Sequence, residues 1–145
     1  MNTANVSPRR WTFRVIAFIA LVWNLIGLAM FVVQVRLTPE MVAAMPAAQQ
    51  QVHAATPPWV NIAFGVAVVF GVLGSLALLL GKRLAPPLFM VSLLAIVVQM
   101  VGAYAVTPAW QVYGPAGLAM PVMLVVIAAY LYWYAQKAAT KGWLG

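Results

Sequence analysis

The chain has 145 residues, of which 66% are hydrophobic and 6% charged, with a formal net charge of +7. Soluble domains carry about 25% charged residues, so eight basic residues and one acid cannot cover a water-exposed surface of this size. The composition excludes a soluble fold and predicts one transmembrane domain over residues 1–145. The chain has no cysteine, which excludes disulfides and thiolate chemistry. Its basic residues lie between apolar runs, so we expect membrane lipid and no nucleic acid as a partner.

The first predicted span is an uncharged run over 15–35, between Arg14 and Arg36. About 20 apolar residues cross the hydrocarbon core as a helix, which satisfies its own backbone hydrogen bonds. Arg9 and Arg10 precede the run, as in a twin-arginine export signal. The run is longer than a signal core and no clear cleavage site follows it, so we expect it to stay as a span.

The longest connection, 36–58, predicts short amphipathic helices on the outer side of the membrane. Thr38 followed by Pro39 and Glu40 is typical of a helix start, with the threonine as cap and the acid near the positive end of the dipole. Pro46 interrupts the segment. We expect these helices to rest on the membrane or on the bundle, and the alternative is a lid over a pore.

Three further apolar runs, at 59–80, 87–106 and 117–134, are each long enough to span the membrane. Pro121 lacks an N–H and leaves carbonyls free near Gly117, which indicates either a kink that lines a cavity or a capped turn. Together the four runs predict an all-α, integral membrane four-helix bundle.

Basic residues orient the bundle. Four spans place seven of them on one side and only Arg36 on the other, so the positive-inside rule predicts that both termini are cytoplasmic. The seven are Arg9, Arg10, Arg14, Lys82, Arg83, Lys137 and Lys141.

Ionisable side chains are missing from the predicted spans, because the only acid, Glu40, and the only histidine, His53, both lie in the 36–58 connection. Proton pathways, paired-carboxylate hydrolysis, catalytic triads and metal sites all need such groups. We therefore expect a protein that is not an enzyme and has no cofactor, metal or catalytic residues.

The spans do contain neutral polar residues. Asn24, Ser75, Ser92 and Gln99 are the candidates, and Trp23 flanks the first of them. They predict either hydrogen bonds between helices or an uncharged polar pocket for a neutral solute.

Small residues recur every four positions along the second span and predict a helix-packing ridge, either within the chain or between two copies. The ridge comprises Ala63, Ala67, Gly71 and Ser75.

Several short motifs between Trp11 and Trp143 resemble those of a family of small four-span bacterial inner-membrane proteins, uncharacterised in function, which automated labels often call sugar transporters. The resemblance implies a bacterial inner-membrane location and supplies no catalytic or substrate residues. The motifs are Trp23-Asn24 with Gly27, Thr38-Pro39-Glu40, Thr56-Pro57 with Trp59, Leu73-Gly74-Ser75, Ser92-Leu93, Val98-Gln99-Met100, Tyr113-Gly114-Pro115, Met120-Pro121 and Lys141-Gly142-Trp143.

We therefore expect a multi-pass, non-enzymatic structural or interaction protein of the bacterial inner membrane. It would act as a homo-oligomer or within a larger membrane complex. The alternative is a small carrier or channel for a neutral, sugar-like solute, with Trp23, Asn24 and Gln99 in its lining.

Overall fold

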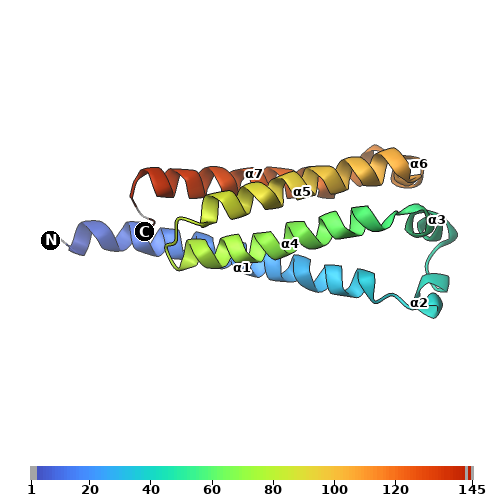
Figure 1. The fold of residues 1–145 in the computed structure, drawn as a ribbon, viewed down its shortest axis with the longest axis horizontal. Coiled ribbons are helices and arrows are strands. Elements are labelled where there is room, and N and C mark those ends of the chain that lie inside the picture. Colours follow the sequence, from blue (N-terminus) through green and yellow to red (C-terminus); the bar gives the residue numbers. More distant parts are fainter. Residues whose placement is uncertain (1–2, 143, 145) are drawn as a thin grey trace.

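The computed structural model describes residues 3–142 and 144, with side chains from Trp11 onward, and Trp143 lies outside the described residues. The described part has helices and no strands, and four of its helices are long and apolar enough to cross a membrane (Figure 1). The predicted all-α class is thus confirmed, and the number of helices that could cross a membrane agrees with the four predicted spans. The long helices are α1 (Thr3–Val35), α4 (Pro58–Leu79), α5 (Ala85–Val106) and α7 (Ala119–Thr140).

Three of the long helices extend well beyond the apolar runs, and α1 does so at its start, which is Thr3 rather than 15. α5 begins at Ala85 rather than 87, because Pro86 and Pro87 fit the first helical turn, where a missing N–H costs little. α7 continues from 134 to Thr140, because Ala135 and Ala138 are buried in the bundle although polar residues follow the apolar run. Burial of one face therefore extends this helix past its apolar sequence.

Short helices occupy the connections. Between α1 and α4 lie α2 (Pro39–Ala43) and α3 (Ala47–Ala55), and the Thr38 hydroxyl caps α2 by accepting a hydrogen bond from the Met41 N–H at 3.2 Å. Between α5 and α7 lie α6 (Ala109–Tyr113) and the 3-10 helix η1 (Pro115–Leu118).

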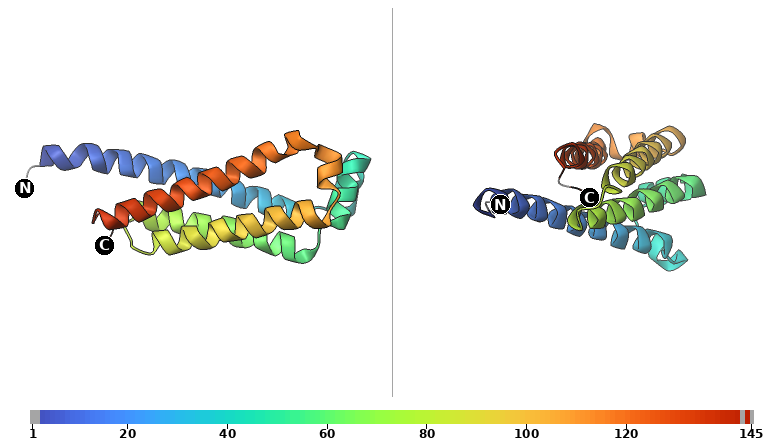
Figure 2. Two further views of the ribbon diagram at one scale, coloured as in Figure 1. Left: turned by 90° about the horizontal axis from the view of Figure 1, so that it is seen from above. Right: turned by 60° about the vertical axis from the view of Figure 1, so that its left-hand side comes forward.

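The four long helices form two layers, α1 with α4 and α5 with α7 (Figures 1 and 2). α4 packs against both α1 and α5, and α7 packs against α5. In its most apolar stretch 44% of the residues of α4 are buried, against 11% in the corresponding stretches of α1 and of 115–140. α4 is therefore the central helix, and α1 and α7 are the edges.

One face of α1 packs along one face of α4 in antiparallel register. The contacts step by three or four residues on both helices, the spacing that keeps side chains on one helical face. The rings of Phe31 and Phe64 meet edge to face, with centroids 5.5 Å apart. The paired positions are Asn24 with Gly71, Gly27 with Val68, Phe31 with Phe64, and Gln34 with Asn61.

A buried apolar cluster joins all four long helices near the end of the bundle where both termini lie (Figure 1). Phe89 and Leu78 are the large, fully buried residues of this cluster, and alanines make up much of the rest. Small side chains let the helix backbones come close, which is how helices pack in lipid. Its members are Phe13, Ala17, Ala20, Ala77, Leu78, Ala85, Phe89, Leu131, Tyr134, Ala135, Ala138 and Leu144.

A tight turn joins α4 to α5. Gly81 adopts φ 70°, its N–H donates to the Leu78 carbonyl at 3.0 Å, and the Lys82 N–H donates to the Ala77 carbonyl at 2.7 Å. This pair of bonds is a Schellman motif, in which a left-handed residue after the helix satisfies its last carbonyls. The motif turns the chain directly into α5.

Replacing Gly81 by alanine should destabilise the bundle by about 1 kcal/mol, because a Cβ disfavours the left-handed conformation. Gly81→Asn should cost less, since asparagine tolerates this conformation. Reversible unfolding in mixed detergent measures both variants. Equal losses for the two would show that the backbone conformation is not what matters at this position.

Candidate functional site

The polar residue deepest in α1 is Asn24, and its half-buried side chain bonds within its own helix and to α4. Its Nδ2 donates to the Ala20 carbonyl at 2.9 Å and to the Ser75 hydroxyl at 3.2 Å. Ser75 is fully buried, and its hydroxyl donates in turn to the Gly71 carbonyl at 2.8 Å. These side chains thus form a short hydrogen-bonded chain from α1 into the backbone of α4, here called the Asn24 cluster.

The Asn24 cluster requires a glycine at position 71. A Cβ there would overlap the Oδ1 and Cγ atoms of Asn24, so any other residue would push the amide away. Because Gly71 is also the acceptor for Ser75, one turn of α4 provides both the space and the hydrogen-bond acceptor for this contact.

Ser92 makes a separate contact, between α5 and α4. Its hydroxyl donates to the Ala67 carbonyl at 2.7 Å, and the side chain is buried. The small-residue ridge therefore meets different helices at successive turns, α5 at Ala67 and α1 at Gly71. All four ridge residues, including Ala63 and Ser75, are buried within the chain.

Trp23 and Gln99 stand apart from the Asn24 cluster. Trp23 lines a shallow apolar hollow of about 280 Å³ formed by side chains of α1 alone. Gln99 is half-buried on α5, and its side chain makes no hydrogen bond within the described part of the chain. Of the five candidate residues, the structure thus joins only Asn24 and Ser75 by a side-chain hydrogen bond, and the hollow beside Trp23 offers no polar lining.

Two polar contacts were not predicted from the sequence. Gln34 Nε2 donates to Asn61 Oδ1 at 2.7 Å, linking α1 to α4 near the α2–α3 end. The sequence did contain a signal for this bond, because the amides of Gln34 and Asn61 lie near the ends of two consecutive antiparallel spans that face each other. The Tyr104 hydroxyl donates to the Gly117 carbonyl at 2.8 Å. This is the carbonyl that Pro121, lacking an N–H, leaves without a helical partner.

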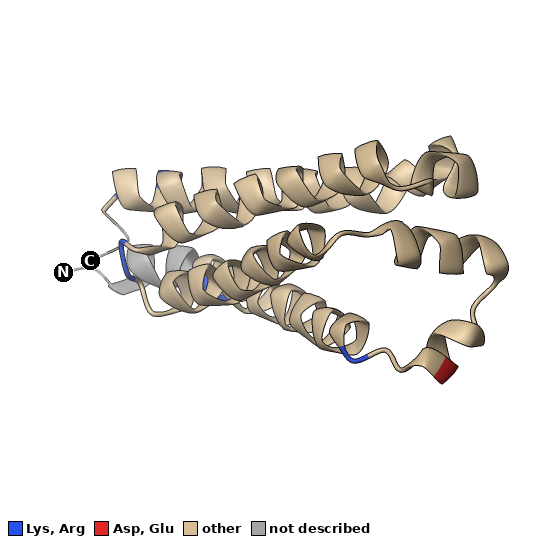
Figure 3. Ribbon diagram, turned by 45° about the vertical axis from the view of Figure 1, so that its right-hand side comes forward, with Lys and Arg blue, Asp and Glu red and all other residues tan. Residues whose placement is uncertain are grey.

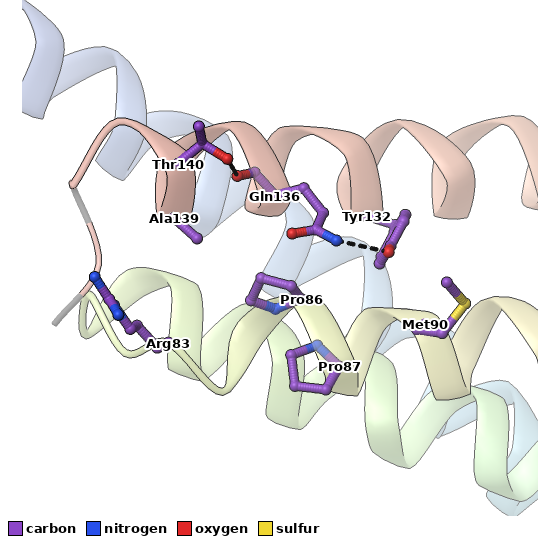
Figure 4. Close-up of a pocket in the computed structure, with 8 residues that line it drawn as sticks. All are labelled: Arg83, Pro86, Pro87, Met90, Tyr132, Gln136, Ala139 and Thr140. Carbon is purple, nitrogen blue, oxygen red and sulfur yellow. Dashed lines mark hydrogen bonds between the residues drawn. The ribbon is translucent and has the colours of Figure 1, made fainter.

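A groove lies between the start of α5 and the end of α7, close to the chain termini (Figure 4). We call it the α5–α7 groove; its volume is about 530 Å³. A second hollow, of about 300 Å³, lies between α1 and α3 at the opposite end, with Gln34 and His53 among its lining. The groove is lined by Arg83, Pro86, Pro87, Met90, Tyr132, Gln136, Ala139 and Thr140.

The described residues do not bring together three His, Cys, Asp or Glu side chains, the minimum for a metal site of protein ligands. The chain matches no known protein family, no protein of established function and no solved structure. Its four long apolar helices are those of a multi-pass membrane protein with a helix-bundle fold.

Gly71→Ala should destabilise the protein by about 1–3 kcal/mol, the usual cost of overpacking. Asn24→Ala should cost about 0.6 kcal/mol, the average for a membrane hydrogen bond. If the two residues meet as described, Gly71→Ala should be much less harmful once Asn24 is alanine. Unfolding of the two single variants and the double variant in bicelles measures this coupling. Additive losses would contradict the contact.

Proposed function

We propose that this protein is a non-enzymatic structural or interaction protein of the bacterial inner membrane, which binds another membrane-spanning helix from a second copy or a larger complex. The observation that carries the proposal is the contrast between two amides in its spans. The Asn24 amide is hydrogen-bonded inside the bundle, whereas the Gln99 amide has no partner among the described residues.

Internal hydrogen bonds favour a packing role for the other polar side chains of the spans. Asn24, Gln34 and Tyr104 each donate to a group on a neighbouring segment of the same chain. A carrier for a neutral solute needs polar groups that can exchange their protein partners for the solute. Groups already bonded between helices hold the bundle together instead, which supports a structural role.

Gln99 supports the interaction role. An amide without a hydrogen bond in hydrocarbon is costly, and polar side chains on membrane helices commonly bond across to another helix. Ile96 and Ala103, three and four residues from Gln99 on the same face of α5, are half-buried and offer an apolar surface for such a contact. A helix that supplies a donor or acceptor to Gln99 would cover these two side chains as well.

The proposed orientation places both termini in the cytoplasm. The helix bounds put five basic residues toward the terminal end of the bundle and Arg36 toward the α2–α3 end; the five are Arg14, Lys82, Arg83, Lys137 and Lys141. Figure 3 colours the Lys and Arg residues blue. The positive-inside rule assigns the first end to the cytoplasm, and the resemblance to four-span bacterial inner-membrane proteins supports that membrane.

Removal of the Gln99 amide should weaken association. A photo-crosslinking amino acid at Ala103, which is half-buried one turn from Gln99 on the same face, should capture a neighbouring membrane protein or a second copy in native membranes. Gln99→Leu should reduce this product about threefold, the effect of losing a membrane hydrogen bond of roughly 0.6 kcal/mol. Gln111→Leu is the matched control, because Gln111 is exposed on the short helix α6.

Two results would contradict the proposed role. One is a crosslink that Gln99→Leu leaves unchanged. The other is uptake of uncharged sugars by vesicles containing the purified protein, faster than by empty vesicles, provided that Asn24→Leu abolishes it. The second result would establish the carrier function instead.

The orientation predicts a definite pattern for reporter fusions. Alkaline phosphatase, which is active only outside the cytoplasm, should be inactive when fused after residue 145 or inserted into the 81–84 turn between α4 and α5. The same enzyme inserted into the α2–α3 connection, between 43 and 47, should be active. Fluorescence of a reporter that folds only in the cytoplasm provides the complementary measurement. An active C-terminal phosphatase fusion would reverse the orientation.

A further inference from the structure

We propose that the α5–α7 groove binds an anionic phospholipid, with the phosphate at Arg83 and the glycerol region between Tyr132 and the two prolines. The binding site would be formed by the start of α5 and the end of α7, which the chain brings together at the terminal end of the bundle (Figure 4). This inference goes beyond the proposed function, because it does not depend on Gln99 or on a protein partner.

Arg83 supplies the cationic end of the groove. Its Nε donates to the Leu144 carbonyl at 3.3 Å, which holds the guanidinium beside the last turn of α7. The other guanidinium N–H groups make no hydrogen bond within the described residues and are available to a ligand. A guanidinium presents parallel donors that match the oxygens of a phosphate group.

Polar groups follow along α7, one turn apart. Gln136 Nε2 donates to the Tyr132 hydroxyl at 2.7 Å, so the tyrosine proton remains available to donate to a ligand oxygen. The Thr140 hydroxyl donates to the Gln136 carbonyl at 2.9 Å and keeps its own oxygen as an acceptor. A lipid offers complementary groups here, with ester oxygens as acceptors and headgroup hydroxyls as donors.

The opposite wall, on α5, is apolar. Pro86 and Pro87 have no backbone N–H, and Met90 follows them one turn deeper in the helix. This wall suits the glycerol backbone and the first methylenes of an acyl chain.

The length of the groove favours a lipid over a free phosphate ion. From Thr140 to Tyr132 the helix rises about 12 Å, too far for one phosphate to contact both ends. Along this length the lining changes from Arg83 to Met90, as a phospholipid changes from phosphate to hydrocarbon. Because α7 is an edge helix, the groove can be reached sideways from the bilayer.

The test uses native mass spectrometry of the purified full-length protein, titrated with phosphatidylglycerol or with phosphatidylcholine of the same acyl chains. The wild-type protein should retain one phosphatidylglycerol more tightly than phosphatidylcholine. Arg83→Gln should weaken phosphatidylglycerol binding about tenfold, the loss expected for a charge-assisted hydrogen-bond pair. Lys82→Gln removes the same charge from the adjacent residue, outside the groove lining, and should weaken binding less than twofold.

Uncharged variants separate the groove from general surface charge. Because Arg83 also holds the Leu144 carbonyl, Tyr132→Phe and Gln136→Leu provide independent variants. Each should weaken phosphatidylglycerol binding severalfold without changing the net charge, whereas Gln111→Leu should not. Circular dichroism and melting temperature verify that each variant is folded.

Equal effects of Arg83→Gln and Lys82→Gln, with no effect of Tyr132→Phe or Gln136→Leu, would overturn the proposal and leave only surface attraction to anionic lipid. Inorganic phosphate or glycerol 3-phosphate that displaces bound phosphatidylglycerol at millimolar concentration would overturn it as well. That result would identify a site for a soluble phosphate compound.

Discussion

The close approach of α1 to α4 at Asn24 and Gly71 is the contact on which the rest of the bundle depends. In lipid, apolar side chains gain little by leaving their solvent, so helices are held by close packing and hydrogen bonds. Gly71 permits the close packing, and Asn24 provides the hydrogen bond to Ser75. Once this contact is made, the register of the two helices is fixed, and Phe31 meets Phe64 about two helical turns further along.

α4 serves two neighbours because its small residues are distributed around more than one face. Gly71 accommodates the Asn24 side chain of α1. On the α5 side, the Ala67 carbonyl accepts a hydrogen bond from the Ser92 hydroxyl, and Gly74 lies against the Phe89 ring. Successive turns of the small-residue ridge thus contact different partners. The distribution explains why α4 is the most buried span and why α1 and α7 keep most of their surface for lipid or for other proteins.

Much of the fold follows from sequence, because the length of an apolar run decides whether it can span a membrane. The partner of Asn24 could not be predicted, since Ser75 and Gln99 were both candidates and the choice depends on how each helix is rotated. The extent of α7 was underestimated, because burial of Ala135 and Ala138 continues the helix past its apolar run. The α5–α7 groove could not be found either, because Arg83 and Gln136 are distant in sequence and meet only through helix packing.

The hydrogen bond from Asn24 to the carbonyl of Ala20 has a consequence for biosynthesis. α1 is made first, and α4 emerges only after the connection that holds α2 and α3. During that interval the amide of Asn24 enters the bilayer without Ser75. Its bond to Ala20 lies within a single helix, so one amide proton is already partnered when α1 is inserted. The arrival of α4 then adds the second bond, and the solitary helix need not expose a wholly unsatisfied amide while it waits.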